Sequence, residues 1–173
     1  MNSTIKDIIE RRSVRKFRPE QINDEELKTI LECGTWAASG GNRQTAIIVA
    51  VQNEEYIKKM SAMNAAVMGA DTDPFYGAPT VVVVLADRSA GNRVADGSLV
   101  LGNMMLAAHA LGIGSCWINR AREVFNTDEG KALLKEFGVE GDYEGVGNLI
   151  LGYPDGDLPA PSPRKENYIT LVK

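Results

Sequence analysis

The segment Thr80-Val81-Val82-Val83-Val84-Leu85 is the strongest strand signal in this chain of 173 residues. β-Branched residues favour strands, and an unbroken apolar run predicts a strand that is buried on both faces. After a polar connector from Asp87 to Asp96, the stretch 97–111 is rich in Leu, Met and Ala and ends before Gly112. Its apolar residues cover most sides of a helix, which predicts a central buried helix. We therefore expect the core to form around this strand and this helix.

Further elements are expected on both sides of this pair. Thr4 followed by Asp7 resembles a capping box at the start of a first helix, and Asn23 is suited to cap a second. The residues alone are compatible with a plain α/β sheet. Apolar runs predict strands at residues 46–51, 113–118 and 146–152, and helical spacing predicts helices at residues 4–12, 23–34, 54–68 and 127–138.

The C-terminal region is spaced by prolines and ends in an apolar segment. Pro154, Pro159, Pro161 and Pro163 precede the strand-like residues 168–172. A terminus that reaches out and adds to a sheet, its own or a partner's, would explain this pattern.

The composition bounds the class of protein. Apolar residues make up 44% of the chain and charged residues 24%, and the length predicts a single domain over residues 1–173. A net charge of −4 argues against general nucleic-acid binding, which needs a broad basic face. The first residues contain no apolar signal-peptide region, and no apolar run is long enough to cross a membrane. Cys33 and Cys116 form no C-x-x-C pair, so we expect free thiols in a reducing cytoplasm.

The usual signatures of catalysis by protein side chains are missing. His109, the single histidine, lies in the predicted central helix, and we expect a core or interface residue because metal sites need clustered ligands. The sequence has no G-x-S-x-G elbow and no G-x-x-x-x-G-K-[ST] phosphate loop. Gly145-Val146-Gly147 begins like a dinucleotide fingerprint but lacks the third glycine and the following helix. No metal and no catalytic side chain are therefore expected.

Basic residues crowd into one short segment near the N-terminus. Arg11, Arg12, Arg15, Lys16 and Arg18 lie within eight positions of a mildly acidic chain, with Ser13 among them. Guanidinium groups recognise phosphate and carboxylate through paired donors, although the segment is equally compatible with a solvated helix end. Two other polar segments, 39–44 and 164–165, suit an amide-rich flat ligand and a second contact to phosphate.

Four motifs in order resemble the FMN-dependent nitroreductase family over nearly the whole chain. They are Arg11-Arg12-Ser13-Val14-Arg15-Lys16-Phe17, Ala38 to Gln44, Asn103 to Ile118, and Leu151-Gly152-Tyr153-Pro154 followed by Pro163-Arg164-Lys165. The resemblance implies an α+β nitroreductase-like fold, with a central, mostly antiparallel sheet flanked by helices. It also implies an intertwined homodimer, with a C-terminal strand that reaches the partner and FMN at the subunit interface.

The resemblance also implies which residues bind the cofactor. Arg11 and Arg164, helped by Lys165, would hold the FMN phosphate, and Arg15 would lie near the N1/C2=O edge of the flavin. A backbone N–H near Asn119 would bond flavin N5. The full expected set is Arg11, Arg12, Ser13, Arg15, Ser39, Gly40, Asn42, Gln44, Trp117, Ile118, Asn119, Arg164 and Lys165, with residues 39–44 contributed by the other subunit.

Some positions depart from the family pattern. Ala38 stands where the family often has Pro, and Thr45-Ala46 stands where it often has Pro-Trp. The connector 87–96 is short where larger members insert a helical excursion over the pocket. The chain therefore resembles a small member with an open pocket. Four residues, Met60, Met63, Phe75 and Tyr76, either shape the substrate side or belong to the core.

The activity implied by the resemblance is two-electron transfer on FMN. NADH or NADPH would reduce the flavin, and a nitroaromatic, quinone or similar electron-poor molecule would then oxidise it in a ping-pong cycle. One alternative is an FMN-binding or sensing module without turnover. A second is a divergent flavin enzyme that carries out dehalogenation or flavin fragmentation, and a third is a small interaction protein. No nucleic-acid or membrane partner is expected.

Overall fold

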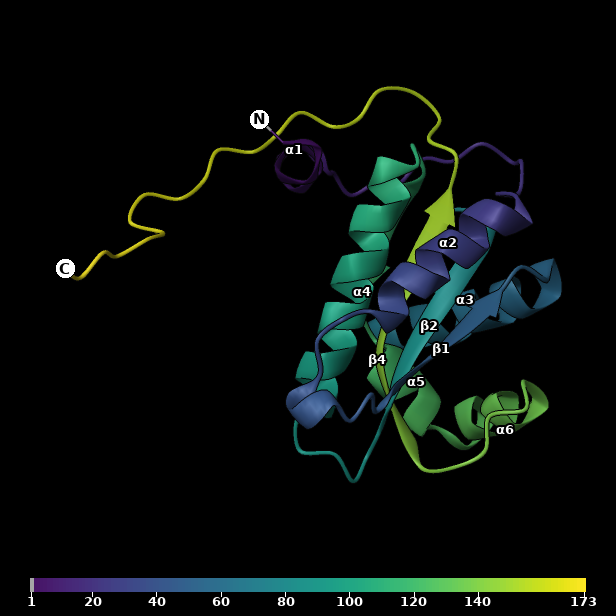
Figure 1. The fold of residues 1–173 in the computed structure, drawn as a ribbon. Coiled ribbons are helices and arrows are strands. Elements are labelled where there is room, and N and C mark those ends of the chain that lie inside the picture. Colours follow the sequence, from purple (N-terminus) through teal and green to yellow (C-terminus); the bar gives the residue numbers. More distant parts are fainter. Residues whose placement is uncertain (1) are drawn as a thin grey trace.

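β2 (Thr80–Asp87) lies at the centre of the fold, as the sequence predicts, and α4 (Arg93–Ala110) packs against it (Figure 1). The prediction that this helix is buried on most sides is wrong for a single chain, since Leu99 on its outer face is 50% exposed. The computed structural model describes residues 2–173. β2 lies inside a four-stranded antiparallel sheet with the strand order β1-β2-β4-β3. The predicted α+β fold, with an antiparallel sheet flanked by helices, is confirmed.

Apart from η1 and α5, which were not predicted, the remaining elements follow the predicted order along the chain. The other strands are β1 (Ala46–Val51), β3 (Gly114–Ile118) and β4 (Tyr143–Gly152). The other helices are α1 (Ser3–Glu10), α2 (Asp24–Thr35), the single 3-10 turn η1 (Gly40–Asn42), α3 (Glu54–Met68), α5 (Ala121–Asn126) and α6 (Asp128–Glu136).

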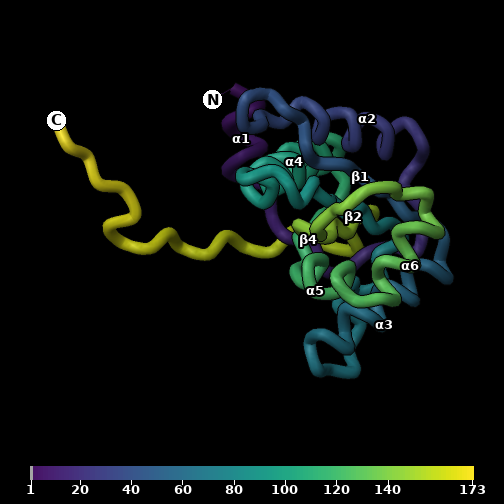
Figure 2. The backbone as a smooth tube through the Cα atoms, turned by 90° about the horizontal axis from the view of Figure 1, so that it is seen from below, coloured from purple at the N-terminus to yellow at the C-terminus, as the bar shows by residue number. Residues whose placement is uncertain are grey.

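Helices cover both faces of the sheet, and β2 serves both layers. Val81, Val83 and Leu85 pack with residues of α3, α5 and α6. Val82 and Val84 point the other way and pack with residues of α2 and α4. Figure 2 shows these two helical layers above and below the strands. Because successive side chains of a strand point to opposite faces, a strand between two apolar layers needs an apolar residue at every position.

Several helix boundaries differ from the sequence-based prediction. The predicted Thr4–Asp7 capping box is wrong, because Asn2 caps α1 and its Oδ1 accepts a hydrogen bond from Thr4 N at 2.8 Å. At α2, Asn23 and Glu26 form a full capping box. This helix continues past Gly34, which faces Met104 so closely that a Cβ would collide with it.

Further boundaries differ in the second half of the chain. α4 begins at Arg93 inside the predicted polar connector, and α5 was not predicted.

The two glycines of Gly145-Val146-Gly147 in β4 allow neighbouring groups to pack closely against the strand. A Cβ on Gly145 would lie 2.3 Å from the carbonyl oxygen of Ala121, and one on Gly147 would lie 2.7 Å from Trp117 Nε1. The close approach of α5 and the indole therefore explains these glycines.

The C-terminal tail leads away from the body of the chain as an extended segment (Figures 1 and 2). All residues from Asp155 to Lys173 are exposed, and Val172 is 93% exposed. The predicted strand at residues 168–172 does not form within a single chain, since these residues have no strand beside them in the described structure. Its pairing with a partner's sheet stays a prediction.

Candidate functional site

The arginine-rich segment directly follows α1 and is held against the start of β3. Val14 N donates to the carbonyl oxygen of Ser115 at 3.0 Å, and Ser13 forms a parallel bridge with Ser115. Val14 is buried, whereas Ser13 is half-buried and Arg15 is exposed. The backbone of this segment is therefore fixed by the sheet, while its polar side chains stay available at the surface.

Arg11 and Arg12 have different environments, although they are adjacent. Arg12 Nη1 donates to the carbonyl oxygens of Ile9 at 2.7 Å and of Arg11 at 2.9 Å, so it satisfies free carbonyls at the end of α1. Arg11 Nη1 is buried and has no hydrogen-bond partner among the described residues, and the same is true of Arg12 Nε. Arg11, however, makes no side-chain hydrogen bond in the described part of the chain. A buried cationic donor without an acceptor is costly, so Arg11 has the unused donor that an anionic ligand would satisfy.

Arg11 and Arg164, which are both predicted to hold the FMN phosphate, line the same surface hollow. The hollow has a volume of about 770 Å³ and lies between the N-terminal segment and the tail. Arg164 Nη2 donates to the carbonyl oxygen of Ser162 at 2.7 Å. Lys165 does not line this hollow, and its ammonium lies 5.2 Å from the ring centre of Tyr168. The residues that line it are Ile8, Ile9, Arg11, Arg12, Ser13, Arg15, Pro159, Ala160, Pro161, Ser162 and Arg164.

The beginning of the tail is fastened to the arginine-rich segment. Asp155 N donates to the carbonyl oxygen of Lys16 at 3.0 Å, and the Lys16 ammonium lies 2.7 Å from the Asp155 carboxylate. The hydrogen bond and the charge of Lys16 hold the pKa of Asp155 below its ordinary value of 3.8. Phe17 also forms an antiparallel bridge with Pro154. These contacts direct the tail past Arg11.

Met60, Met63, Phe75 and Tyr76, which the sequence assigns either to the core or to the substrate side, have different environments in the structure. Met60 and Phe75 are each 1% exposed and belong to the core. Met63 is half-buried and packs against the same cluster. Tyr76 is exposed, and the Arg15 guanidinium carbon lies 5.9 Å from its ring centre. Of the four, the structure thus brings Tyr76 into contact with a predicted cofactor residue.

The loop from Ser39 to Gln44 is already shaped by its own hydrogen bonds. Gln44 N donates to Ser39 Oγ at 3.0 Å, and Gln44 Nε2 donates to Asn42 Oδ1 at 3.2 Å. Gly40 N donates to Asp96 Oδ1 at 3.0 Å, which ties the loop to the first turn of α4. The loop is therefore ordered without the prolines that the family often carries here.

The two halves of the predicted site lie at opposite ends of α4. The loop 39–44 contacts the first turn of this helix, and the arginine-rich segment lies beside Ser115, just after its last turn. A helix of 18 residues is about 27 Å long. Within one chain, the loop 39–44 and the arginine-rich segment are therefore separated by roughly the length of α4.

The end of β3 provides a third group of predicted residues. Ile118 is buried and Asn119 is exposed. Trp117 is half-buried, and its Nε1 has no hydrogen-bond partner among the described residues. Asn64 Nδ2 donates to the carbonyl oxygen of Asn119 at 2.9 Å. Asn64 was missed in the sequence, although it continues the core-facing spacing of Ile57 and Met60, where a polar residue is unusual.

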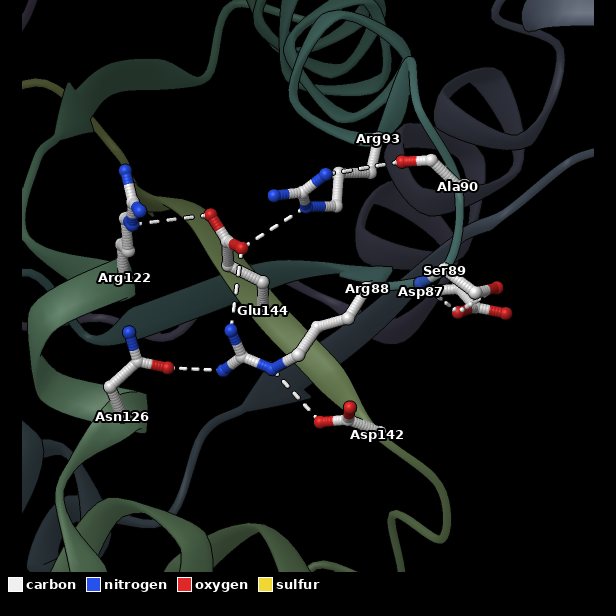
Figure 3. A network of polar contacts seen from close by, with 9 residues as sticks. All are labelled: Asp87, Arg88, Ser89, Ala90, Arg93, Arg122, Asn126, Asp142 and Glu144. Atoms are coloured by element: carbon white, nitrogen blue, oxygen red, sulfur yellow. Dashed lines mark hydrogen bonds and ion pairs between the residues drawn. The ribbon is translucent and has the colours of Figure 1, made fainter.

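An ion-pair network around the buried Glu144 lies near the start of α4 and was not predicted (Figure 3). The side chain of Glu144 in β4 is 3% exposed, and its carboxylate lies 3.4 Å from Arg88, 3.0 Å from Arg93 and 3.2 Å from Arg122. Arg88 also donates to Asn126 and Asp142. The network connects the end of β2, the start of α4 and the start of β4 with α5, and it includes none of the predicted site residues.

Among the described residues, neither a metal-binding cluster nor a membrane-spanning helix is present. Among residues 2–173, no group of three or more His, Cys, Asp or Glu side chains is arranged to hold a metal ion. In the same range, none of the helices combines the length and apolar character needed to span a bilayer.

Comparisons with known proteins agree with the fold. A protein of Archaeoglobus fulgidus, provisionally named NADH dehydrogenase/NAD(P)H nitroreductase, is 34% identical over 160 residues, which cover 89% of this chain and 87% of the relative. An NADPH-flavin oxidoreductase of Vibrio harveyi is 27% identical over 99% of this chain and 73% of the relative. A Bacteroides fragilis nitroreductase crystallised with bound FMN is 31% identical, with a TM-score of 0.92 and full coverage of both chains.

The family model gives the same result over most of the sequence. The model described as "Nitroreductase family" matches residues 8–153, from the end of α1 to the residue after β4. The matched range contains the arginine-rich segment, the loop 39–44 and the end of β3. This chain belongs to the nitroreductase family.

Proposed function

We propose that this chain works as a homodimeric, FMN-dependent NAD(P)H oxidoreductase that reduces nitroaromatics, quinones or similar electron-poor molecules. The family match, the FMN in the similar crystal structure and the flavin oxidoreductase among the relatives support FMN as cofactor and NAD(P)H as donor. The observation that carries the proposal is the buried, unpartnered Nη1 of Arg11 in a hollow shared with Arg164.

The donor groups present fit FMN at both of its ends. Arg11 and Arg164 offer planar donor forks, which match a phosphate dianion. Ser13 adds a hydroxyl beside them. Arg15, next to Tyr76, places a cation where the loop before β2 meets the N-terminal segment. The exposed end of β3 leaves backbone N–H groups for the flavin ring. When bound, FMN accepts two electrons from the nicotinamide and passes them to the oxidant, while these residues hold and orient it.

A homodimer explains why the predicted site is divided along α4. A two-fold axis repeats each surface on the partner, so the loop 39–44 of one copy can meet the arginine-rich segment of the other. Apolar side chains exposed on α1 and α4 support such an interface. They are Ile5, Ile8, Ile9, Val94 and Leu99, which are 49–56% exposed in a single chain.

The tail supports the same assembly. It carries exposed apolar residues at its end, with Ile169 77% and Leu171 78% exposed. β1 lies at one edge of the sheet and is covered on one side only by β2. We infer that the tail of each copy packs on its partner and that residues 1–173 form one flavin-binding domain. The free cysteines Cys33 and Cys116 support a reducing compartment such as the cytoplasm.

The test is a visible absorption spectrum of the purified protein, first with FMN and then under anaerobic addition of NADH or NADPH. We expect a bound flavin spectrum that bleaches promptly with at least one donor and returns when a nitroaromatic or a quinone is added. Flavin that binds but does not bleach would indicate a sensing module. Recovery of fragmented flavin, or release of halide from a halogenated acceptor, would indicate one of the divergent reactions. Failure to bind FMN would overturn the proposal.

A further inference from the structure

Two buried amides, Asn64 and Asn148, and the half-buried Arg120 contact one another or the backbone at the end of β3. We propose that Asn64, Arg120 and Asn148 are positioning residues that fix the direction of the backbone N–H groups of Asn119 and Arg120, so that these donors face the bound flavin. The inference rests on the proposed function, because FMN supplies the acceptor.

Two successive carbonyl groups at the end of β3 are held from inside the protein. Asn64 Nδ2 donates to the carbonyl oxygen of Asn119 at 2.9 Å. Asn148 Nδ2 lies 3.4 Å from the carbonyl oxygens of both Ile118 and Asn119. The side chains that make these contacts are deeply buried, since Asn64 is 1% exposed and Asn148 is 2% exposed. Both carbonyls therefore point into the body of the chain.

The direction of the carbonyls determines the direction of the N–H groups. A trans peptide group is planar, so its N–H points opposite to its C=O. The N–H of Asn119 is opposite to the carbonyl of Ile118, and the N–H of Arg120 is opposite to the carbonyl of Asn119. In the described part of the chain, neither N–H donates to a protein acceptor. Two outward donors at an exposed strand end are thus free for a ligand atom.

Arg120 determines which way the Asn64 amide is turned. Its Nε donates to Asn64 Oδ1 at 2.8 Å, so the amide oxygen faces the guanidinium and Nδ2 faces Asn119. Without this cation, the amide could turn and place its oxygen against the Asn119 carbonyl. Arg120 itself has φ of 76°, a conformation that side chains other than glycine rarely adopt. Strained backbone of this kind is maintained only where the surroundings enforce it.

The proposed effect concerns electron transfer more than cofactor retention. Fixed donors aimed at an atom that gains charge stabilise the transition state without reorganisation during the reaction. The FMN phosphate would be held by Arg11 and Arg164, in a different part of the site. Disturbing the buried amides should therefore change the spectrum and the reduction rate of bound FMN more than its affinity.

The main test is Asn64→Asp, which keeps the acceptor for Arg120 but replaces the donor to Asn119 with a second acceptor. We expect shifted absorption bands of bound FMN and single-turnover reduction by NAD(P)H that is slower by about tenfold or more, as for loss of one hydrogen bond. The dissociation constant of FMN should change by less than about threefold. Arg120→Gly accepts the same φ without a guanidinium and should act in the same direction.

The matched control is Asn53→Asp, the same chemical change at the start of the same helix. Asn53 caps α3 and is exposed, and aspartate caps helices equally well. Its spectrum and reduction rate should match those of the unchanged protein. If Asn64→Asp does not fold, Arg120→Gly supplies the same measurement.

The outcomes separate the inference from the proposed function. Unshifted bands and unchanged reduction rates in folded, FMN-loaded Asn64→Asp or Arg120→Gly would overturn the inference and leave the proposed function intact. An unchanged protein that neither binds nor reduces FMN would overturn the proposed function, and the inference with it.

Discussion

The arginine-rich segment and the loop 39–44 are both predicted to contact FMN, yet they differ in whether their hydrogen-bond donors have partners within the chain. The loop uses its own groups, since Gln44 N bonds Ser39 Oγ and Gly40 N bonds Asp96. In the arginine-rich segment, Arg11 retains a buried donor without an acceptor. The loop is thus complete before a ligand arrives, and the segment is not. We infer that the segment supplies binding energy and the loop supplies shape, each from a different copy of the chain.

The strongest test of this difference is Arg11→Ala. Charge-assisted hydrogen bonds contribute about 1.5–3 kcal/mol each, so the dissociation constant of FMN should rise about 100-fold. Fluorescence titration of FMN measures this change. Arg18→Ala is the control, because Arg18 is exposed and does not line the hollow. Equal affinity of the unchanged protein and Arg11→Ala would refute the assignment of the phosphate to Arg11.

A smaller effect is expected when the loop loses its polar side chains. Ser39→Ala/Gln44→Ala removes two hydrogen bonds inside the loop, from Gln44 N to Ser39 Oγ and from Gln44 Nε2 to Asn42 Oδ1. Each contributes about 1 kcal/mol to the shape of the loop, and FMN would have to supply this energy on binding, so its affinity should fall about 30-fold. Because each site would use both copies, unfolding and refolding this variant together with Arg11→Ala should restore about a quarter of the tight sites, through dimers that carry one of each. Mixing that restores no tight site would contradict a site divided between two chains.

Arg164 and Lys165 are adjacent in the tail, and the sequence predicts that both lie near the FMN phosphate. Only Arg164 lines the hollow with Arg11, whereas Lys165 lies over Tyr168. Arg164→Ala should weaken FMN binding about tenfold, less than Arg11→Ala, because ordering an exposed tail side chain offsets part of its contact energy. The same titration on Lys165→Ala should give a smaller change. A larger effect for Lys165 would reverse the assignment.

The smallest expected effect lies where the tail is fastened to the arginine-rich segment. Lys16 lowers the pKa of Asp155, so this contact stabilises the fold above the unfolded pKa of the carboxyl group and is lost as pH falls through the folded one. Lys16→Met should return the pKa of Asp155 toward its ordinary 3.8, as followed by carboxyl NMR. Lys58→Met, which removes an ion pair with Glu54 on α3, should leave Asp155 unchanged. No change in Lys16→Met would mean that the pair is absent in solution.

The sequence predicted most of the fold because its signals are local. The valine run of β2, the Asn23–Glu26 capping box and the α3 boundaries are each set by neighbouring residues. α5 was missed because it has only six residues, which is too short for a recognisable helical pattern. The sequence placed the end of α2 at Gly34, but the helix continues to Thr35. The glycine allows Met104 of α4 to pack closely and does not mark the helix terminus.

The residues of the candidate site, and the assignment of the loop 39–44 to the other subunit, come from the family resemblance and stay predictions. The structure adds that, within one chain, α4 lies between this loop and the hollow lined by Arg11 and Arg164. The buried amides of Asn64 and Asn148 could not be assigned from sequence, because their partners are the backbone carbonyls of residues far away in the chain. Such contacts leave no spacing pattern.

The network around Glu144 has a consequence for how the chain folds and unfolds. Arg88 directly follows β2, and Arg93 begins α4. Their partner Glu144 lies 56 and 51 positions later in the sequence, respectively. This contact cannot form until β4 has joined β2, so it develops after the slow search for long-range pairing. Interactions absent from the folding transition state act on the unfolding rate. Glu144 and its arginines should therefore prolong the lifetime of the folded chain without making it fold faster.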